Sequence, residues 1–209
     1  GSLSLDLALG GGWPFGKMVL NVGTWSTGKT LLSLKAIQSL QKYSHETKQL
    51  LQPGETPCSA LWIAFDPFDG ARAEAVGLNT EDITVLTPED LNDGIDTVTQ
   101  AVYHNVFDLI IIDTISGAVA GREHKKSASD NPFAGANAVV FNDAFRKWQT
   151  LLNTCHERVG GIPATIWSNN HFREKFVALY QDTKTYPGGH GQSDFASIIV
   201  YLNAIKYKD

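Results

Sequence analysis

Residues 23–30 have the residue types and the spacing that bind phosphate groups in many proteins. They read GTWSTGKT and match the pattern G-x-x-x-x-G-K-[ST] of a phosphate-binding loop. The glycines let backbone N–H groups turn toward a phosphate, and the Lys29 ammonium can reach the outer phosphates. The Thr30 hydroxyl can ligate Mg²⁺ at the positive end of a following helix. The predicted nucleotide-binding residues are Gly23, Thr24, Trp25, Ser26, Thr27, Gly28, Lys29 and Thr30.

The flanking segments are those that such a loop requires. Residues 18–22 are an apolar run typical of a buried strand, and residues 31–37 have helical apolar spacing. A chance glycine-rich turn is the alternative interpretation. Strand, loop, helix and the terminal Lys-Thr together favour nucleotide binding.

Asp113 follows four aliphatic residues, 109–112, which indicate a parallel strand buried on both faces. An acidic residue at such a strand end, beside a phosphate-binding loop, can hold Mg²⁺ through water. It could instead cap the following segment. We therefore treat Thr30 and Asp113 as candidate Mg²⁺ ligands, and Thr114 could share the hydrogen bonding.

Asp66 ends another apolar run, residues 60–65. We expect this strand to neighbour the strand that enters the phosphate-binding loop, which would place the carboxylate near the γ-phosphate, where a water must be oriented. Asp66 is thus the candidate catalytic carboxylate, and Lys29 is a second candidate catalytic residue. Because Asp66-Pro67 is also a turn signal, a turn-forming role stays open. Asp69 is assigned to the nucleotide-binding set.

Asn170 and His171 follow a third apolar run, residues 164–168, so their side chains are expected at the same edge of the sheet. A polar group there can sense a γ-phosphate, and His171 is the candidate sensor. A lone histidine is more often a structural residue, and that alternative also stays open.

The rest of the chain alternates between strand-like and helix-like segments. Helices are predicted near residues 71–76, 91–107 and 139–158, and further strands at 83–86 and 198–205. Residues 43–57 are polar, contain Pro53-Gly54, and are interpreted as an inserted surface connection. This alternation predicts an α/β fold, a doubly wound, mostly parallel sheet flanked by helices, with ligands at the carboxyl ends of its strands.

The composition suits one intracellular domain. The chain has 209 residues, 43% of them hydrophobic, with no apolar stretch near the length that spans a bilayer, so a cytoplasmic location without membrane contact is expected. Cys58 and Cys155 are far apart and predict neither a disulfide nor a zinc site. The net charge of −5 would repel nucleic acid, so any DNA contact must be local.

Two segments could provide such a local contact. Residues 122–126 include Arg122, Lys125 and Lys126, and residues 172–189 interleave basic and aromatic side chains before a Pro-Gly-Gly sequence. Basic and aromatic residues on a loop suit a nucleic-acid backbone and its bases. Ordinary surface loops are the alternative.

Several separate stretches resemble the ATPase core of the RecA recombinase family, in its bacterial and phage forms. Residues 1–10 read GSLSLDLALG, similar to the family's G-S-L-S-L-D-x-A-L-G, which suggests that the first two residues are native. Residues 170–175, NHFREK, are similar to its N-Q-x-R-E-K, and residues 187–189 and 195–197 resemble its P-G-G and Y-A-S. The resemblance covers nearly the whole chain.

The resemblance implies a RecA-like P-loop NTPase core over residues 1–209 that uses ATP and Mg²⁺. It implies a DNA-dependent ATPase that binds single-stranded DNA in a filament, with ATP between protomers, and pairs it with homologous duplex DNA for strand exchange and repair. Residues 122–135 fall at the family's first DNA-binding loop and 172–187 at its second. The implied DNA-binding residues are Arg122, Lys125, Lys126, Arg173, Lys175, Tyr180, Gly188 and Gly189.

The sequence departs from the family in several places. Asp66 stands where the family has a catalytic Glu, and the match needs a one-residue gap, without which Phe65 would align; hydrolysis is therefore expected to be slow. His171 replaces a Gln, a phage-like feature. An N-terminal polymerisation element and a C-terminal domain are expected to be absent, and Lys206 and Lys208 could match lysines that contact ATP across the filament interface. A ring-forming helicase and a weakly hydrolysing regulatory paralogue stay open as alternatives.

Overall fold

The computed structural model describes residues 3–118, 136–171, 173–174, 184–185, 187, 189 and 191–203. Six parallel strands form one sheet in the order β3-β2-β4-β5-β1-β8, and the short β6 and β7 pair antiparallel. The strands are β1 (Met18–Gly23), β2 (Ala60–Ala64), β3 (Ile83–Leu86), β4 (Leu109–Asp113), β5 (Thr165–Asn170), β6 (Arg173–Glu174), β7 (Lys184–Thr185) and β8 (Ile198–Leu202). The helices are α1 (Leu3–Ala8), α2 (Lys29–Leu40), α3 (Gly70–Val76), η1 (Thr80–Asp82), α4 (Leu91–His104), α6 (Ala136–Asn153), α7 (Cys155–Arg158) and α8 (Gly191–Phe195).

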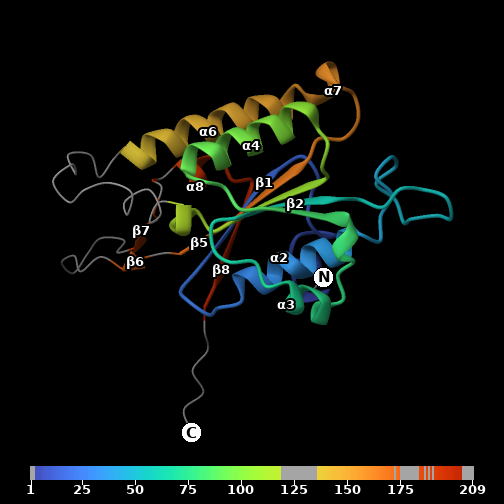
Figure 1. The fold of residues 1–209 in the computed structure, drawn as a ribbon, viewed down its shortest axis with the longest axis horizontal. Helices are drawn as coiled ribbons and strands as arrows, with labels where there is room; N and C mark the ends of the chain where they lie inside the picture. The colour runs from blue at the N-terminus through green and yellow to red at the C-terminus, as the bar shows by residue number, and fades with distance from the viewer. Residues whose placement is uncertain are drawn as a thin grey trace, which may run out of the picture.

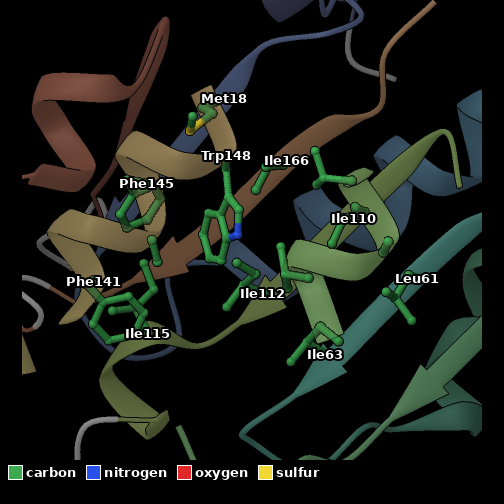
Figure 2. Close-up of a cluster of buried hydrophobic side chains, with 14 of the residues drawn as sticks. Met18, Leu61, Ile63, Ile110, Ile112, Ile115, Phe141, Phe145, Trp148 and Ile166 are labelled. Carbon is green, nitrogen blue, oxygen red and sulfur yellow. The ribbon is translucent and has the colours of Figure 1, made fainter. Parts of the chain in front are cut away.

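Helices cover both faces of the sheet, with α4 and α6 on one side and α2 and α3 on the other (Figure 1). Because strand side chains alternate between faces, each central strand contributes to two cores. Ile110 and Ile112 pack under α4 and α6, where Trp148 is fully buried (Figure 2). Ile111 packs on the opposite face with residues of α2 and α3. The predicted doubly wound α/β fold is confirmed.

The prediction that β2 neighbours the strand of the phosphate-binding loop is wrong. β2 pairs with β3 and β4, while β5 and β8 are the neighbours of β1. Apolar runs identify buried strands, but they do not encode lateral order: every residue of β1 and β2 is buried, as is every residue of the central strands β4 and β5. Two strands, β4 and β5, therefore lie between β1 and the strand that leads to Asp66.

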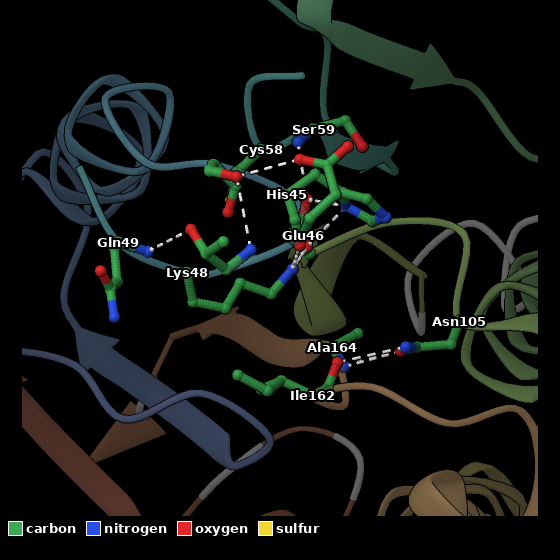
Figure 3. Close-up of polar contacts among 12 residues, drawn as sticks. His45, Glu46, Lys48, Gln49, Cys58, Ser59, Asn105, Ile162 and Ala164 are labelled. Atoms are coloured by element: carbon green, nitrogen blue, oxygen red, sulfur yellow. Dashed lines mark hydrogen bonds and ion pairs between the residues drawn. The ribbon is translucent and has the colours of Figure 1, made fainter. Parts of the chain in front are cut away.

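Two helices differ from the predicted bounds. The helix expected at residues 91–107 ends at His104, because Asn105 adopts a left-handed conformation with φ of 52°. The Asn105 side chain then donates to Ile162 O and accepts from Ala164 N, which ties the end of α4 to the segment entering β5 (Figure 3). The helix expected at 139–158 is divided into α6 and α7 around Thr154.

The inserted segment, residues 43–57, is fixed to the sheet by the buried carboxylate of Asp108, which immediately precedes β4. Asp108 accepts hydrogen bonds from Ser59 N at 2.9 Å and contacts His45 Nδ1 at 2.9 Å, and it forms an ion pair with Lys48. The Asp108 and Lys48 side chains are 2% and 7% exposed, so both charges are largely removed from water. Asp108 thus joins the insertion to the start of β2 and β4.

We expect Asp108→Ala to destabilise the protein by about 3–5 kcal/mol, because the buried Lys48 ammonium loses its carboxylate partner and keeps only His45 O, and Ser59 N–H loses its acceptor. Urea denaturation followed by circular dichroism would measure the change. Asp96→Ala, at an exposed position of α4, serves as the control and should change stability by less than about 0.5 kcal/mol. Equal effects of both substitutions would contradict an anchoring role for Asp108.

Both cysteines are buried and free. Burial raises the pKa of the Cys58 thiol to about 12 and also raises that of Cys155, so the unreactive thiol form dominates. Within the described part of the chain, no helix has the length and apolar character needed to cross a membrane.

Candidate functional site

The phosphate-binding loop connects the carboxyl end of β1 to α2, as the sequence predicts. Gly28 has φ of 93°, a left-handed conformation that glycine adopts without strain, and Ser26 has φ of 59°. Gly23 is required for a different reason: a Cβ there would lie 2.6 Å from Leu202 O and closer still to the Thr27 hydroxyl. Thr27 Oγ1 donates to Thr24 O at 2.9 Å and closes the turn.

Lys29 lies at the start of α2 with only 5% of its surface exposed. Its ammonium donates to Gly23 O at 3.0 Å and to Thr24 O at 2.7 Å, so the side chain folds back along the loop. Burial lowers the pKa of Lys29 from its usual 10.5 to about 8, although the charges of Asp113 and Asp66 oppose the shift. The positive charge is thus held where an anion would compensate its burial.

Asp113 ends β4 beside the first turn of α2 and is 4% exposed. Thr30 Oγ1 donates to its Oδ2 at 3.1 Å, and Asn169 Nδ2 donates to its Oδ1 at 3.0 Å. Burial raises the pKa of the Asp113 carboxyl, and the hydrogen bonds from Asn169 and Thr30 act in the opposite direction. The predicted pair of Thr30 and Asp113 is therefore brought together.

This pair suits Mg²⁺, which prefers oxygen ligands and is commonly held by one or two carboxylates together with substrate phosphates. Among the residues that the structure describes, no three His, Cys, Asp or Glu side chains are grouped so as to hold a metal ion by themselves. The ion would therefore depend on ligands from a bound nucleotide as well as on Thr30 and Asp113.

Asp66 lies next to Asp113 despite the unexpected strand order. Phe65 N and Asp66 N both donate to Asp113 O at 2.9 Å, which fixes the backbone beyond β2. Thr114 Oγ1 donates to Asp66 Oδ2 at 2.9 Å. A cavity of about 170 Å³ opens here, and its wall includes Thr30, Asp66, Asp69 and Asp113. Thus the carboxylate faces the space beside the predicted metal ligands.

Asp69 belongs to this cavity wall and also caps α3. Its side chain accepts from Arg72 N at 3.0 Å, and Arg72 lines the same cavity. The structure consequently gives Asp69 a local structural role in addition to the predicted position near a nucleotide.

His171 is buried at the end of β5 and contacts the phosphate-binding loop directly. Its Nδ1 lies 3.1 Å from Lys29 Nζ, and its ring stacks on Trp25 with centroids 3.9 Å apart. Trp25 is 75% exposed, so this aromatic stack forms the solvent side of the loop. His171 thus lies within reach of the lysine that would hold the outer phosphates, as a sensing role requires.

Comparison with known proteins agrees with this geometry. Residues 1–208 match the family described as RecA N-terminal domain. The chain belongs to the RecA family. Protein RecA of Streptococcus equi subsp. zooepidemicus is 29% identical over 199 residues, which cover 95% of this chain and 47% of that protein. Protein RecA of Porphyromonas gingivalis is 28% identical, with 95% and 53% covered, and that of Leptospira meyeri 28%, with 99% and 48% covered.

This RecA-family chain therefore spans about half the length of the curated relatives it matches. Most of the predicted DNA-binding residues lie outside the described residues, as do Lys206 and Lys208. Arg173 is described only as part of the backbone pairing of β6 with β7. The predicted residues outside the description are Arg122, Lys125, Lys126, Lys175, Tyr180 and Gly188.

Gly189 is described, and it lies beside a polar clamp that the sequence did not predict. Asn170 Nδ2 donates to Pro187 O at 2.9 Å and to Gln192 Oε1 at 2.7 Å. Gln192 Nε2 in turn donates to Pro187 O and Gly189 O. A Cβ on Gly189 would lie 2.7 Å from Cβ of Ala138, so glycine allows this segment to pack on α6. The Pro-Gly-Gly end of the predicted second DNA loop is thus attached to the residue before His171.

A second unpredicted group is a buried amide layer beneath the phosphate-binding loop, formed by the side-chain amides of Asn21 and Asn169 together with the Ser33 hydroxyl. Asn21, Ser33 and Asn169 are all fully buried and connect β1, α2 and β5. Polar residues within the buried strands β1 and β5 were the available signal. Their partners lie more than 130 residues apart in sequence, so spacing alone could not pair them.

Proposed function

We propose that this chain is the ATPase core of a DNA recombinase that binds single-stranded DNA in a filament and pairs it with homologous duplex DNA. The observation that carries the proposal is the convergence of Lys29, Thr30, Asp113 and Asp66 at the carboxyl ends of β1, β4 and β2. Membership of the RecA family and the name Protein RecA of its relatives support it. We also propose that residues 1–209 act as one domain.

In this proposal, Lys29 binds the outer phosphates of ATP and exchanges its contacts with Gly23 O and Thr24 O for phosphate oxygens. Thr30 and Asp113 would hold Mg²⁺, which supplies charge neutralisation on the transferred phosphoryl group. Asp66, held by Thr114, orients the attacking water. Because Asp is one methylene shorter than Glu, turnover is expected to be slow.

His171 would communicate the state of the nucleotide to the DNA loop. It contacts Lys29 on one side, and its backbone N donates to Asn170 Oδ1 at 2.8 Å on the other. Asn170 holds the Pro-Gly-Gly segment at the end of that loop. A phosphate that draws Lys29 away from His171 therefore changes a contact of the residue next to Asn170, which holds the end of the DNA loop. The basic residues of both predicted loops would bind the DNA.

The decisive experiment measures ATP turnover with and without single-stranded DNA at fixed low salt, because phosphate contacts weaken steeply as salt rises. DNA-stimulated turnover, followed by homology-dependent strand exchange, would support the recombinase. Unwinding with translocation and no strand exchange would instead indicate a ring-forming helicase. Tight ATP binding without turnover under either condition would indicate a regulatory paralogue.

We expect nucleotide affinity to fall as the pH rises above about 8. Phosphate binds the charged ammonium, and below pH 8 the free protein already carries that proton on Lys29. Above pH 8 binding must take up a proton, so affinity should decrease by up to about tenfold for each pH unit. Titration calorimetry at pH 7, 8 and 9, in two buffers of different ionisation enthalpy, would measure both effects. A constant affinity without proton uptake would contradict the lowered pKa.

A further inference from the structure

The Asp113 carboxylate is held by two side chains, and one of them belongs to no predicted nucleotide-binding set. Thr30, at the start of α2, donates a hydrogen bond to Oδ2, whereas Asn169, on the neighbouring strand β5, donates one to Oδ1. Of the side chains that the structure describes, these two hydrogen-bond to the carboxylate. With one donor on each oxygen, the carboxylate cannot rotate without losing a bond in a buried site.

Asn169 is itself held rigidly. It is completely buried, and its Oδ1 accepts from Asn21 Nδ2 at 3.1 Å and from Trp167 Nε1 at 3.3 Å. Its Nδ2 also lies 2.9 Å from the Ser33 hydroxyl. These contacts come from β1, β5 and α2, so the amide position is fixed by three elements that surround the phosphate-binding loop.

The chemistry also fixes the amide orientation. With the amide turned over, the Asn169 oxygen would face the Asp113 carboxylate, and two acceptors would meet in a buried site. The orientation with Nδ2 toward Asp113 satisfies both groups. Asn169 can therefore act only as a donor to the predicted metal ligand.

We propose that Asn169 is a positioning residue that orients the Asp113 carboxylate for Mg²⁺ and thereby couples the buried amide layer to metal affinity. The inference rests on the proposed binding of ATP with Mg²⁺, but not on any property of DNA. Partners in the outer sphere of a metal ligand commonly change metal affinity by 10- to 100-fold.

The test compares nucleotide binding with and without Mg²⁺. We expect Asn169→Leu, which has a similar volume but no donor, to raise the Mg²⁺ concentration needed for half-maximal ATP binding by about tenfold or more. Its affinity for ATP in EDTA should change by less than about threefold, because Lys29 and the loop are retained. Fluorescence of a labelled ATP analogue in a Mg²⁺ titration measures the first quantity, and the same assay in EDTA the second.

Thr165→Val is the matched control. It lies at the opposite end of β5, is 5% exposed, and loses one side-chain hydrogen bond to Pro14 O. It should lower stability without changing the Mg²⁺ requirement. Should Asn169→Leu fail to fold, Asn169→Ser is measured by the same criterion, since its hydroxyl is too short to reach Asp113 but remains polar beside Ser33.

An unchanged Mg²⁺ requirement in the Asn169 variant would overturn the inference while leaving the proposed function intact. Equal losses of affinity with and without Mg²⁺ would also overturn it, because they would indicate a general packing defect. If the wild-type protein bound ATP with no dependence on Mg²⁺, the proposed metal site and this inference would both fail.

Discussion

Lys29→Ala is expected to weaken ATP binding by about 100-fold or more. The ammonium is the buried cation of the loop, and charge-assisted bonds to phosphate contribute about 1.5–3 kcal/mol each. The cost of keeping this charge buried is already present in the free protein, as the pKa of about 8 indicates. Binding would relieve that cost, so the loss of affinity should exceed that of a surface lysine. Titration calorimetry with ATP and Mg²⁺ measures it.

The control is Lys35→Ala, on the same helix and six residues after Lys29. Lys35 donates to Gln38 Oε1 and Val76 O, away from the loop, so its removal should leave ATP affinity within about twofold. Thermal unfolding of both variants without nucleotide separates binding from folding. An ATP affinity of Lys29→Ala close to that of the wild type would refute the assigned phosphate site.

The sequence predicts the elements of this fold well because a buried strand requires a run of apolar residues that are adjacent in the sequence. β4 consists of four aliphatic residues followed by Asp113, and every one of its residues is buried. The loop pattern likewise identifies Lys29 and Thr30, because the same few residues must be adjacent to surround a phosphate. Features that depend on neighbours in the chain are thus readable from a single sequence.

The lateral order of the strands and the pairing of distant side chains produce no such local pattern in the sequence. Two strands, β4 and β5, lie between β2 and its expected neighbour β1, and no local sequence pattern indicates that order. Likewise, the position of Asn169 in a buried strand does not indicate that its partners are Ser33 and Asp113. Only the assembled sheet brings these residues together, which is why the site was predicted from its loop and acids but without its supporting amides.

Asp66→Asn is expected to lower ATP turnover by about 100- to 10,000-fold, the range for removal of a general base, while ATP affinity stays within about threefold. Asn has the same shape and can still accept the hydrogen bond that Thr114 donates to Asp66, so the backbone beyond β2 should keep its position. The substitution removes the basicity toward water together with the negative charge that acts on Lys29 and Asp113. Steady-state release of phosphate, with binding measured separately, distinguishes a slower chemical step from weaker binding.

Asp90→Asn controls for the loss of a carboxylate. Asp90 caps α4 by accepting from Asn92 N and Asp93 N, and Asn is an equally good cap, so turnover should not change. Asp66→Glu tests the geometry: it keeps the carboxylate and should retain turnover well above that of Asp66→Asn. The longer Glu side chain has little room on the side of Gly117. The Asp66 carboxylate already lies so close to Gly117 that a Cβ on this glycine would be 2.7 Å from Asp66 Oδ1. If Asp66→Asn instead turned over ATP at the wild-type rate, Asp66 would be a turn residue before Pro67, and the water would have to be oriented by another group.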